Sequence, residues 1–267
     1  MSSASHHTHS HTHEEGGAGN HHSHSHSHDA AAHPHHTPGG IKEANREYFD
    51  SQAHNHSGGY EASPARQLAT KKAVAAILAA VPFDADKTIV MDYACGTGLV
   101  SQGLAPHTKT LIGVDISPKS VEYYNERVAN QGIPPDEMRA ICAELVERGT
   151  GDADPLDEIE FDVIVCTQVY HHFEDINSVT KILASYLKPG TGVLVVVDMI
   201  HSSESEALHK DHGHVVVYKG GFEEEPIRSA FVDAAGLQNY SFRPAFQMGW
   251  QEKQVDLFIA TGIRAAN

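Results

Sequence analysis

Positive charge and cysteine are both scarce in this sequence of 267 residues. Its 19 Lys and Arg residues face 35 Asp and Glu residues, so the net charge is −16 with histidine neutral. Extended contact with nucleic-acid phosphates or with an anionic membrane surface needs the opposite sign of charge. The three cysteines, Cys95, Cys142 and Cys166, each fall in or beside an apolar run. An odd number placed in this way predicts reduced thiols and not a disulfide framework.

Long apolar runs are also missing. None approaches the roughly 20 residues that a membrane-spanning helix needs. The first forty residues contain no apolar segment of the secretory type and no arginine, which argues against a secretory signal and a mitochondrial transit peptide. We therefore expect a cytoplasmic protein, with the nucleus as the alternative compartment. A hydrophobic fraction of 40% still allows one large domain with a real core.

Residues 1–40 differ in composition from the rest of the chain. They hold thirteen histidines among Ser, Thr, Gly and Ala, with no Lys or Arg. Such a segment has too few apolar side chains for a core, so we expect a disordered tail. Its repeated Ser-His pairs suit chelation of Zn, Ni or Cu by several imidazoles. A solvated tail without metal is the other interpretation.

From residue 41 onward, the pattern predicts first helices and then an alternation of strands and helices. An amphipathic stretch at 41–50 and a helix opened by Ser63-Pro64, with Leu68, Ala75, Leu78 and Val81 at helical spacing, form a predicted N-terminal cap over 41–84. The main domain is predicted over 85–267. Its parallel strands are expected at 88–94, 110–115, 139–144, 161–167 and 192–199, and its helices near 98–105, 118–130, 175–187 and 222–235.

Five near-continuous apolar strands separated by helices indicate a parallel sheet covered on both faces. Two further strands, at 237–246 and 255–264, are joined too closely for a crossover helix, so this end of the sheet is expected to be antiparallel. The predicted fold is α/β, a Rossmann-like doubly wound sheet of about seven strands, mostly parallel with an antiparallel C-terminal strand and an N-terminal helical cap.

The segment "DYACGTG", residues 92–98, lies where the first strand turns into its helix, the usual ligand position in a doubly wound sheet. Gly96 and Gly98 allow a sharp turn and a close approach of backbone to a ligand. The dinucleotide fingerprint G-x-G-x-x-G/A has Ser101 at its third position here, and Asp92 stands before the loop. A carboxylate at this position repels a pyrophosphate and favours a cation, such as a sulfonium or an ammonium.

Two more strand ends carry candidate ligand-binding residues. Asp115 ends the second strand, where a carboxylate can accept hydrogen bonds from both ribose hydroxyls, a role shared by many nucleoside-binding folds. Ala143 and Glu144 follow the third strand and are placed to flank an adenine.

The segments "VMDYACGTGLVS", "GVDIS", "FDVIVCTQVYHHFED" and "LKPGTGVLVVVDM" together resemble the ordered motifs of class I S-adenosylmethionine-dependent methyltransferases. They are similar to the small-molecule branch that includes the ubiquinone and menaquinone methyltransferases and many fungal relatives. The resemblance implies S-adenosyl-L-methionine as cofactor. It places the methionine part near Asp92, Ala94, Gly96, Gly98 and Gln168, the ribose at Asp115 and Ile116, and the adenine at Ala143 and Glu144. Ala94 replaces the usual first glycine, and Cys142 stands where many members have Asp.

The segment after the fourth strand is the first candidate for the acceptor site. Tyr170, His171 and His172 follow Gln168 there. Because its pKa lies near working pH, a histidine at this position can take a proton from an acceptor hydroxyl, thiol or amine. The alternative is that both histidines bond to backbone and shape the pocket. Residues Tyr48, Phe49, Phe246, Met248 and Trp250 are candidates for an apolar acceptor wall, although scattered aromatics more often belong to a core.

The second candidate for the acceptor site is the histidine-rich stretch 201–214, where His212 and His214 share a face if the chain is extended. Three interpretations remain open. It is a polar turn leading into a strand at 215–218, a lid that supplies a base, or a metal site lacking the spacing of a zinc signature. The predicted site contains no metal ligand, and its catalytic candidates are Tyr170, His171 and His212.

The predicted function is methyl transfer from S-adenosylmethionine to the oxygen, sulfur, nitrogen or carbon of a small organic acceptor. The other hypotheses are a protein methyltransferase of the same fold and a non-catalytic nucleoside- or metal-binding protein. Nucleic acid is disfavoured as acceptor, because "TQVYHH" replaces the Pro-Pro-aromatic motif of amino-methylating nucleic-acid enzymes and because the charge is strongly acidic. Ser101 and Asp92 disfavour a dehydrogenase.

Overall fold

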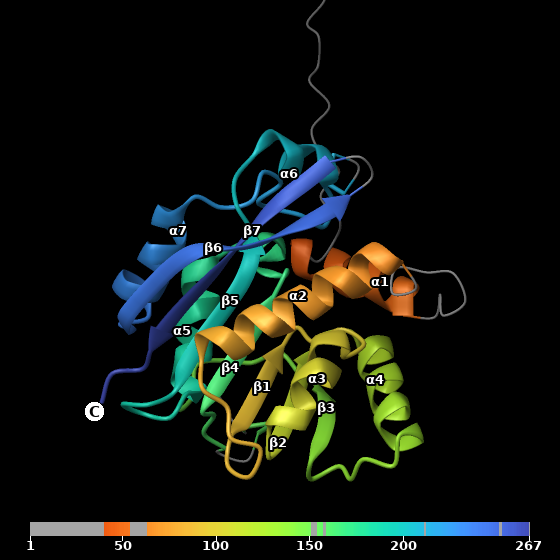
Figure 1. Cartoon of the computed structure of the whole chain (residues 1–267), viewed down its shortest axis with the longest axis vertical. Helices are drawn as coiled ribbons and strands as arrows, with labels where there is room; N and C mark the ends of the chain where they lie inside the picture. The colour runs from red at the N-terminus through yellow and green to blue at the C-terminus, as the bar shows by residue number, and fades with distance from the viewer. Residues whose placement is uncertain are drawn as a thin grey trace, which may run out of the picture. The chain divides into compact units, whose positions relative to one another are not determined.

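A seven-stranded mixed sheet organises the chain in the computed structural model (Figure 1). The structure describes residues 40–53, 63–150, 154–156, 159–210, 212–250 and 253–266, without the side chain of Trp250. The predicted histidine-rich tail and its metal ions therefore lie outside the described residues. Among the described helices, none combines the length and the apolar character needed to cross a membrane.

The strands follow the order β3-β2-β1-β4-β5-β7-β6 across the sheet. Neighbouring pairs from β3 to β5 are parallel, whereas β7 is antiparallel to both β5 and β6. This confirms the predicted doubly wound sheet with an antiparallel C-terminal end. The strands are β1 (Ile89–Tyr93), β2 (Thr110–Asp115), β3 (Met138–Cys142), β4 (Val163–Thr167), β5 (Val193–Met199), β6 (Gln238–Trp250) and β7 (Lys253–Ile263).

The helices also follow the predicted alternation. Those of the N-terminal half are α1 (Gly40–Ala53), α2 (Pro64–Ala80), α3 (Leu99–Leu104), the short turn η2 (Ala105–His107) and α4 (Pro118–Asn130). Those of the C-terminal half are η3 (Tyr170–His172), α5 (Ile176–Tyr186), α6 (Ser203–Leu208), α7 (Glu224–Arg228) and η4 (Ser229–Ala234), which continues α7 as a wider turn.

Caps explain several helix starts. Ser117 caps α4 by accepting from the Ser120 N–H, with proline at the first helical position. Asp175 caps α5 by accepting from the N–H groups of Asn177 and Ser178.

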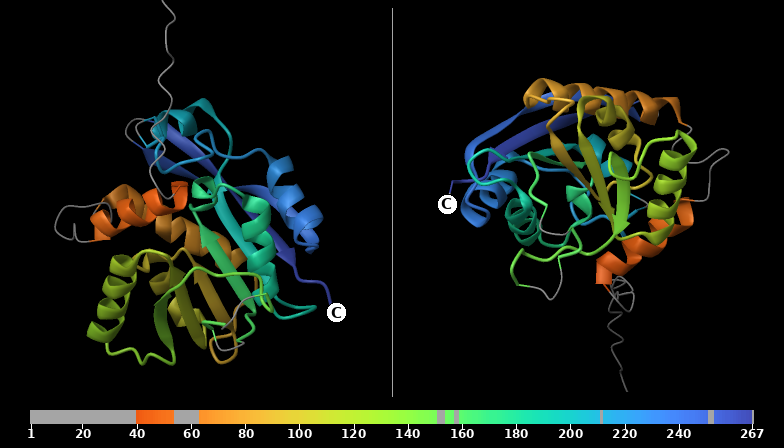
Figure 2. Two further views of the ribbon diagram at one scale, coloured as in Figure 1. Left: turned by 180° about the vertical axis from the view of Figure 1, so that it is seen from behind. Right: turned by 90° about the horizontal axis from the view of Figure 1, so that it is seen from below.

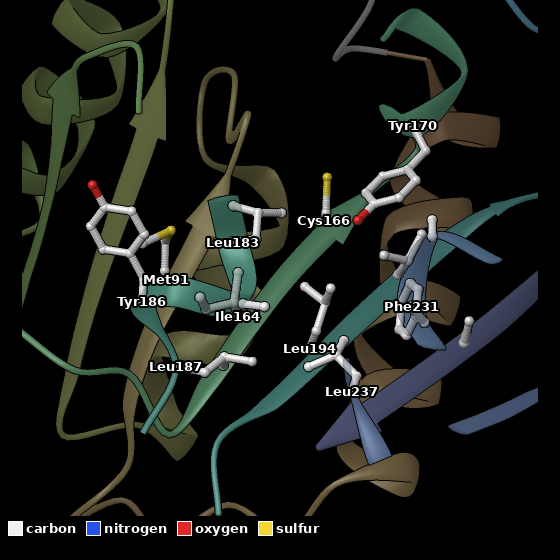
Figure 3. Packing of buried hydrophobic residues seen from close by; sticks show 14 of the residues in the cluster. Met91, Ile164, Cys166, Tyr170, Leu183, Tyr186, Leu187, Leu194, Phe231 and Leu237 are labelled. Atoms are coloured by element: carbon white, nitrogen blue, oxygen red, sulfur yellow. The ribbon is translucent and has the colours of Figure 1, made fainter. Parts of the chain in front are cut away.

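Helices cover both faces of the sheet (Figure 2). On one face, α2, α3 and α4 pack their apolar side chains, among them Ile77, Leu104 and Tyr124, against the strands. On the other face, α5, α7 and η4 form a second buried cluster with β1, β4 and β5, part of which Figure 3 shows. Residues 36–267 form one compact unit, in which α2 packs on β6 and α3. The N-terminal cap helices thus share their packing with the sheet.

One expectation about local structure is wrong, and the buried side of one helix does not follow from the sequence. The helix at 64–80 is correctly predicted, but it buries Ala69, Ala73, Val74 and Ile77, while Leu68 is 54% exposed. Its second half, residues 73–80, is apolar all round, so spacing alone does not identify the buried side. Residues 215–218 form turns and no strand, and the preceding residues contain the short helix α6. Val215 and Val216 lie in a loop and are buried under α1. A run of buried valines is also typical of a strand, so the sequence pattern does not distinguish the two structures.

Gly98 enters α3 with a φ of +86°, in the left-handed region. A Cβ at this position would overlap the ring of Tyr124, which is 1% exposed. Gly132 has a similar φ of +73°, but no atom lies within 4 Å of the place where its Cβ would be. Both glycines have a strained φ, but only Gly98 is closely packed. A comparison of the two positions therefore separates the cost of backbone strain from the cost of overpacking.

We predict that Gly98→Ala lowers the free energy of unfolding by about 2–4 kcal/mol, because strain and overpacking add. The matched Gly132→Ala is expected to cost only about 1 kcal/mol, for the strain alone. Urea denaturation of both variants measures the difference. Equal losses would show that the contact between the loop and Tyr124 adjusts without cost.

Candidate functional site

A cavity of about 480 Å³ opens at the carboxyl ends of β1, β2 and β4. Its floor is formed by the loops that follow these strands. Its roof is formed by one side of α1, with residues at positions 41, 45, 48, 49 and 52, and by the first turns of α2. Pockets of this size hold small ligands and cofactors.

The structure brings together most of the predicted cofactor-binding residues. The cavity is lined by Ala94, Gly96, Asp115, Ile116, Ala143, Glu144 and Gln168. Asp92 and Gly98 lie behind the loop and do not line the cavity. Seven of the nine thus share one surface, although they come from four strand ends.

Two lining residues have a backbone conformation that side chains other than glycine rarely adopt. Ala94 and Gln168, at the ends of the neighbouring strands β1 and β4, both have a φ of +55°. Strained residues of this kind persist where the surrounding structure fixes them, and they cluster at functional sites. The unusual φ at both strand ends turns the chain toward the cavity, which both residues line.

Asp115 is held by backbone. Its two carboxylate oxygens accept from the N–H of Gly96 at 2.7 Å and from the N–H of Ser117 at 2.8 Å. Burial raises the pKa of Asp115, against the effect of these two hydrogen bonds. The side chain therefore links the glycine loop of β1 to the start of α4, with lone pairs remaining for a ligand.

Asp92 lies below the loop and is 2% exposed. Its oxygen Oδ2 accepts from the Ser101 hydroxyl at 2.6 Å. Burial raises the pKa of Asp92 to about 7; the Ser101 hydrogen bond opposes this rise, and the nearby Asp115 adds to it. The two acids therefore form a buried pair that a cation in the cavity would stabilise.

The two histidines after β4 have different surroundings. His171 is 5% exposed and does not line the cavity; its Nδ1 lies 2.9 Å from Oδ1 of the fully buried Asp198. Burial alone would raise the pKa of Asp198, but contact with His171 outweighs it, so this pKa lies below its usual value. His172 lines the cavity, and its Nδ1–H donates to the carbonyl oxygen of Val215 at 2.7 Å.

The remaining catalytic candidates lie away from the cavity. Tyr170 is fully buried, with its hydroxyl 3.1 Å from that of Thr180, and Figure 3 shows its ring packed near Cys166. His212 is not part of the cavity lining, and its ring packs edge-on against Tyr48 of α1. Among the residues that the structure describes, no group of three or more His, Cys, Asp or Glu is arranged to hold a metal ion.

Sequence reasoning did not single out four of the residues at this site. Asn45, Arg66 and Thr167 line the cavity, and Ser101, taken only as a departure from the dinucleotide fingerprint, fixes Asp92. No motif marks the first three, because they belong to an ordinary helix face and a strand end. Of the predicted acceptor wall, Tyr48, Phe49 and Met248 line the cavity, whereas Phe246 does not and packs against the apolar cluster of α2, α3 and α4. The side chain of Trp250 lies outside the described residues.

Comparisons with known proteins agree with this geometry. A family model described as a methyltransferase domain matches residues 91–193. An uncharacterized methyltransferase of Schizosaccharomyces pombe is 37% identical over 150 residues, which cover 55% of this chain and 52% of that protein. A ubiquinone biosynthesis O-methyltransferase of Dechloromonas aromatica is 29% identical over 106 residues, 40% of this chain and 42% of that protein. The chain spans about half or less of the length of these curated relatives.

A solved structure shares the fold. The magnesium protoporphyrin IX methyltransferase of Synechocystis, crystallised with bound SAH, superposes with a TM-score of 0.60 at 18% sequence identity. The match covers 84% of this chain and 100% of that one. This likeness concerns the arrangement of sheet and helices.

The raised pKa of Asp92 predicts a particular dependence of stability on pH. Between about pH 4 and pH 7 the folded protein keeps a proton that the unfolded chain has lost, so wild-type stability falls as pH rises through this window. Asp92→Asn removes this titration, and its stability relative to wild type is expected to rise by roughly 4 kcal/mol at most between pH 4 and pH 8. Urea denaturation of the ligand-free proteins measures the difference. A difference that stays constant with pH would contradict the burial of an ionisable acid here.

Proposed function

We propose that residues 91–193, which match a methyltransferase domain, are of the class I type and that this chain transfers a methyl group from S-adenosylmethionine to a small organic acceptor. The domain match agrees with the resemblance seen in the motifs. The relatives named above include an O-methyltransferase of ubiquinone biosynthesis.

The observation that carries the proposal is the position of Asp115 at the cavity. Gly96 and Ser117 hold its two oxygens by backbone hydrogen bonds, which leaves the carboxylate in one orientation at the end of β2. A carboxylate fixed in this way suits the paired hydroxyls of a ribose. Beside it, nothing lies within 4 Å of the place where a Cβ of Gly96 would be, so the loop has room for a ligand.

The charge around the loop supports a cationic ligand in place of a dinucleotide. Asp92 and Asp115 lie at adjacent strand ends, since β1 and β2 pair in register from Ile89 with Thr110 to Tyr93 with Val114. A pyrophosphate against this loop would meet two carboxylates, whereas the sulfonium and ammonium of S-adenosylmethionine would be attracted by them. We propose that Asp92 acts from behind the loop, through its charge.

Arg66 supports a place for the carboxylate of the same ligand. It lines the cavity from the first turns of α2, and burial lowers its pKa to about 9, so the guanidinium stays charged at neutral pH. We propose that Arg66 binds the amino-acid carboxylate, which a guanidinium matches in shape and charge.

In the proposed reaction, the protein contributes mainly by positioning. Bound S-adenosylmethionine would supply an electrophilic methyl group. The strained ends of β1 and β4 would fix the ligand on the floor of the cavity, beneath the roof that α1 forms. Holding two reactants in line in this way can supply about 7–11 kcal/mol of the barrier to reaction. The size of the cavity, about 480 Å³, supports a small acceptor, and the acidic net charge of the chain disfavours nucleic acid. Location in the cytoplasm stays a prediction from the sequence.

We predict that Asp115→Asn weakens binding of S-adenosylhomocysteine by roughly 10- to 100-fold, because hydrogen bonds to a charged group are worth about 1.5–3 kcal/mol. Asp136→Asn, on an exposed loop, is the matched control and should bind as wild type does. Calorimetric titration with S-adenosylhomocysteine and with NADH measures both affinities. Unchanged affinity in Asp115→Asn, or tighter binding of NADH, would contradict the proposed cofactor.

A further inference from the structure

Asn45 carries a buried hydrogen-bond acceptor that has no partner. The residue is 6% exposed and lines the cavity from α1. Its amide nitrogen donates to the carbonyl oxygens of Ile41 and Val215, both at 3.0 Å. Since both partners can only accept, the amide orientation is fixed, and Oδ1 is left without a hydrogen bond among the described residues. A buried acceptor in this state indicates a missing donor.

His172 presents a second acceptor on the same cavity. Because Nδ1 donates to the Val215 carbonyl, the neutral ring carries its lone pair on Nε2. Burial, together with the adjacent His171, lowers the pKa of His172 to about 3, against the opposing effect of the Val215 carbonyl. Other groups around the ring are the buried Asp198 and His209, and none of them makes His172 a cation near neutral pH.

One carbonyl oxygen connects the two residues. Val215 accepts from Asn45 at 3.0 Å and from His172 at 2.7 Å, so the two side chains meet at a single backbone atom. The ring of Phe49 packs edge-on against His172, with centroids 5.5 Å apart. Two side chains that share one carbonyl thus each have a further acceptor atom, and an aromatic ring packs beside them.

We infer that the methyl acceptor is a small primary alkylamine that carries an aromatic ring, bound as the free base, whose two N–H bonds are donated to Oδ1 of Asn45 and Nε2 of His172. This inference rests on the proposed function. A primary amine has two donors for two acceptors and keeps its lone pair for the reaction. A carboxylate or phenolate would place negative charge against the lone pairs of both acceptors. A hydroxyl or thiol has only one hydrogen to donate, so it would satisfy only one of the two acceptors.

The chemistry balances without a protein base. The nitrogen lone pair forms the new N–C bond while the C–S bond breaks, and the electron pair of that bond remains on sulfur. The product is a methylated ammonium, which loses one proton to water after release. A neutral His172 with little affinity for protons is compatible with this sequence, whereas an alcohol would need a stronger base before attack.

The test uses the full chain and one aromatic skeleton with three functional groups: 2-phenylethylamine, 2-phenylethanol and 2-phenylethanethiol. Binding of each is measured by calorimetry on the protein saturated with S-adenosylhomocysteine, and transfer by release of S-adenosylhomocysteine from S-adenosylmethionine. We expect the amine to bind at least 10-fold more tightly than the other two and to be the methylated compound. Its apparent affinity should rise with pH as the free base forms.

Variants separate recognition of the acceptor from folding. Asn45→Ala and His172→Phe are expected to weaken amine binding at least 10-fold while affinity for S-adenosylhomocysteine changes less than about 3-fold. His172→Gln, which returns an acceptor oxygen, should recover part of the loss. The exposed Asn130→Ala and His107→Phe are matched controls and should behave as wild type.

Two groups of outcomes contradict different statements. If S-adenosylhomocysteine binds but the alcohol or thiol is preferred, or the three compounds bind equally or not at all, the amine inference is wrong and the proposed cofactor stands. If S-adenosylhomocysteine itself does not bind, the proposed function is wrong.

Discussion

Two buried carboxylates at adjacent strand ends constrain the rest of this site. Parallel pairing of β1 with β2 fixes Asp92 and Asp115 close to one another, and burial raises the pKa of both. An empty cavity therefore keeps a carboxyl that is costly to ionise, and stability is lost as pH rises. A ligand that brings positive charge reverses this cost. The acid pair therefore favours binding of the ligand at a cost to the stability of the ligand-free protein.

A polar network extends this constraint to other residues of the site. Ser101 fixes Asp92, and the backbone of the glycine loop fixes Asp115. The carbonyl of Val215 orients both Asn45 and His172, which also line the cavity. The proposed cationic methyl donor matches the two acids, and the proposed neutral amine matches the two uncharged acceptors.

Much of the fold could be predicted from the sequence, because its signals are local. Each parallel strand is a short apolar run, and Ser-Pro pairs mark the starts of α2 and α4. The acids and glycines of the cofactor side also follow from their position at strand ends. The buried side of α2 could not be predicted, since Leu68 and Ile77 are equally apolar and only tertiary packing distinguishes them.

The acceptor side was harder to predict for a related reason. His171 and His172 are neighbours in sequence, yet Asp198 holds one in the core while Val215 turns the other to the cavity. Both partners come from distant segments, so the sequence gives no sign of which histidine faces the ligand. Asn45 belongs to a helix whose roof position depends on contacts with the same distant loop.

Proton release on ligand binding tests the electrostatic basis of the site most directly. S-adenosylmethionine can be titrated at pH 6 in buffers of different ionisation enthalpy, and again at pH 9. If its positive charge displaces the proton of Asp92, close to one proton per site, about 0.8–1, is released at pH 6 and almost none at pH 9. Binding without proton release at pH 6 would show that the buried acid pair does not hold the cation.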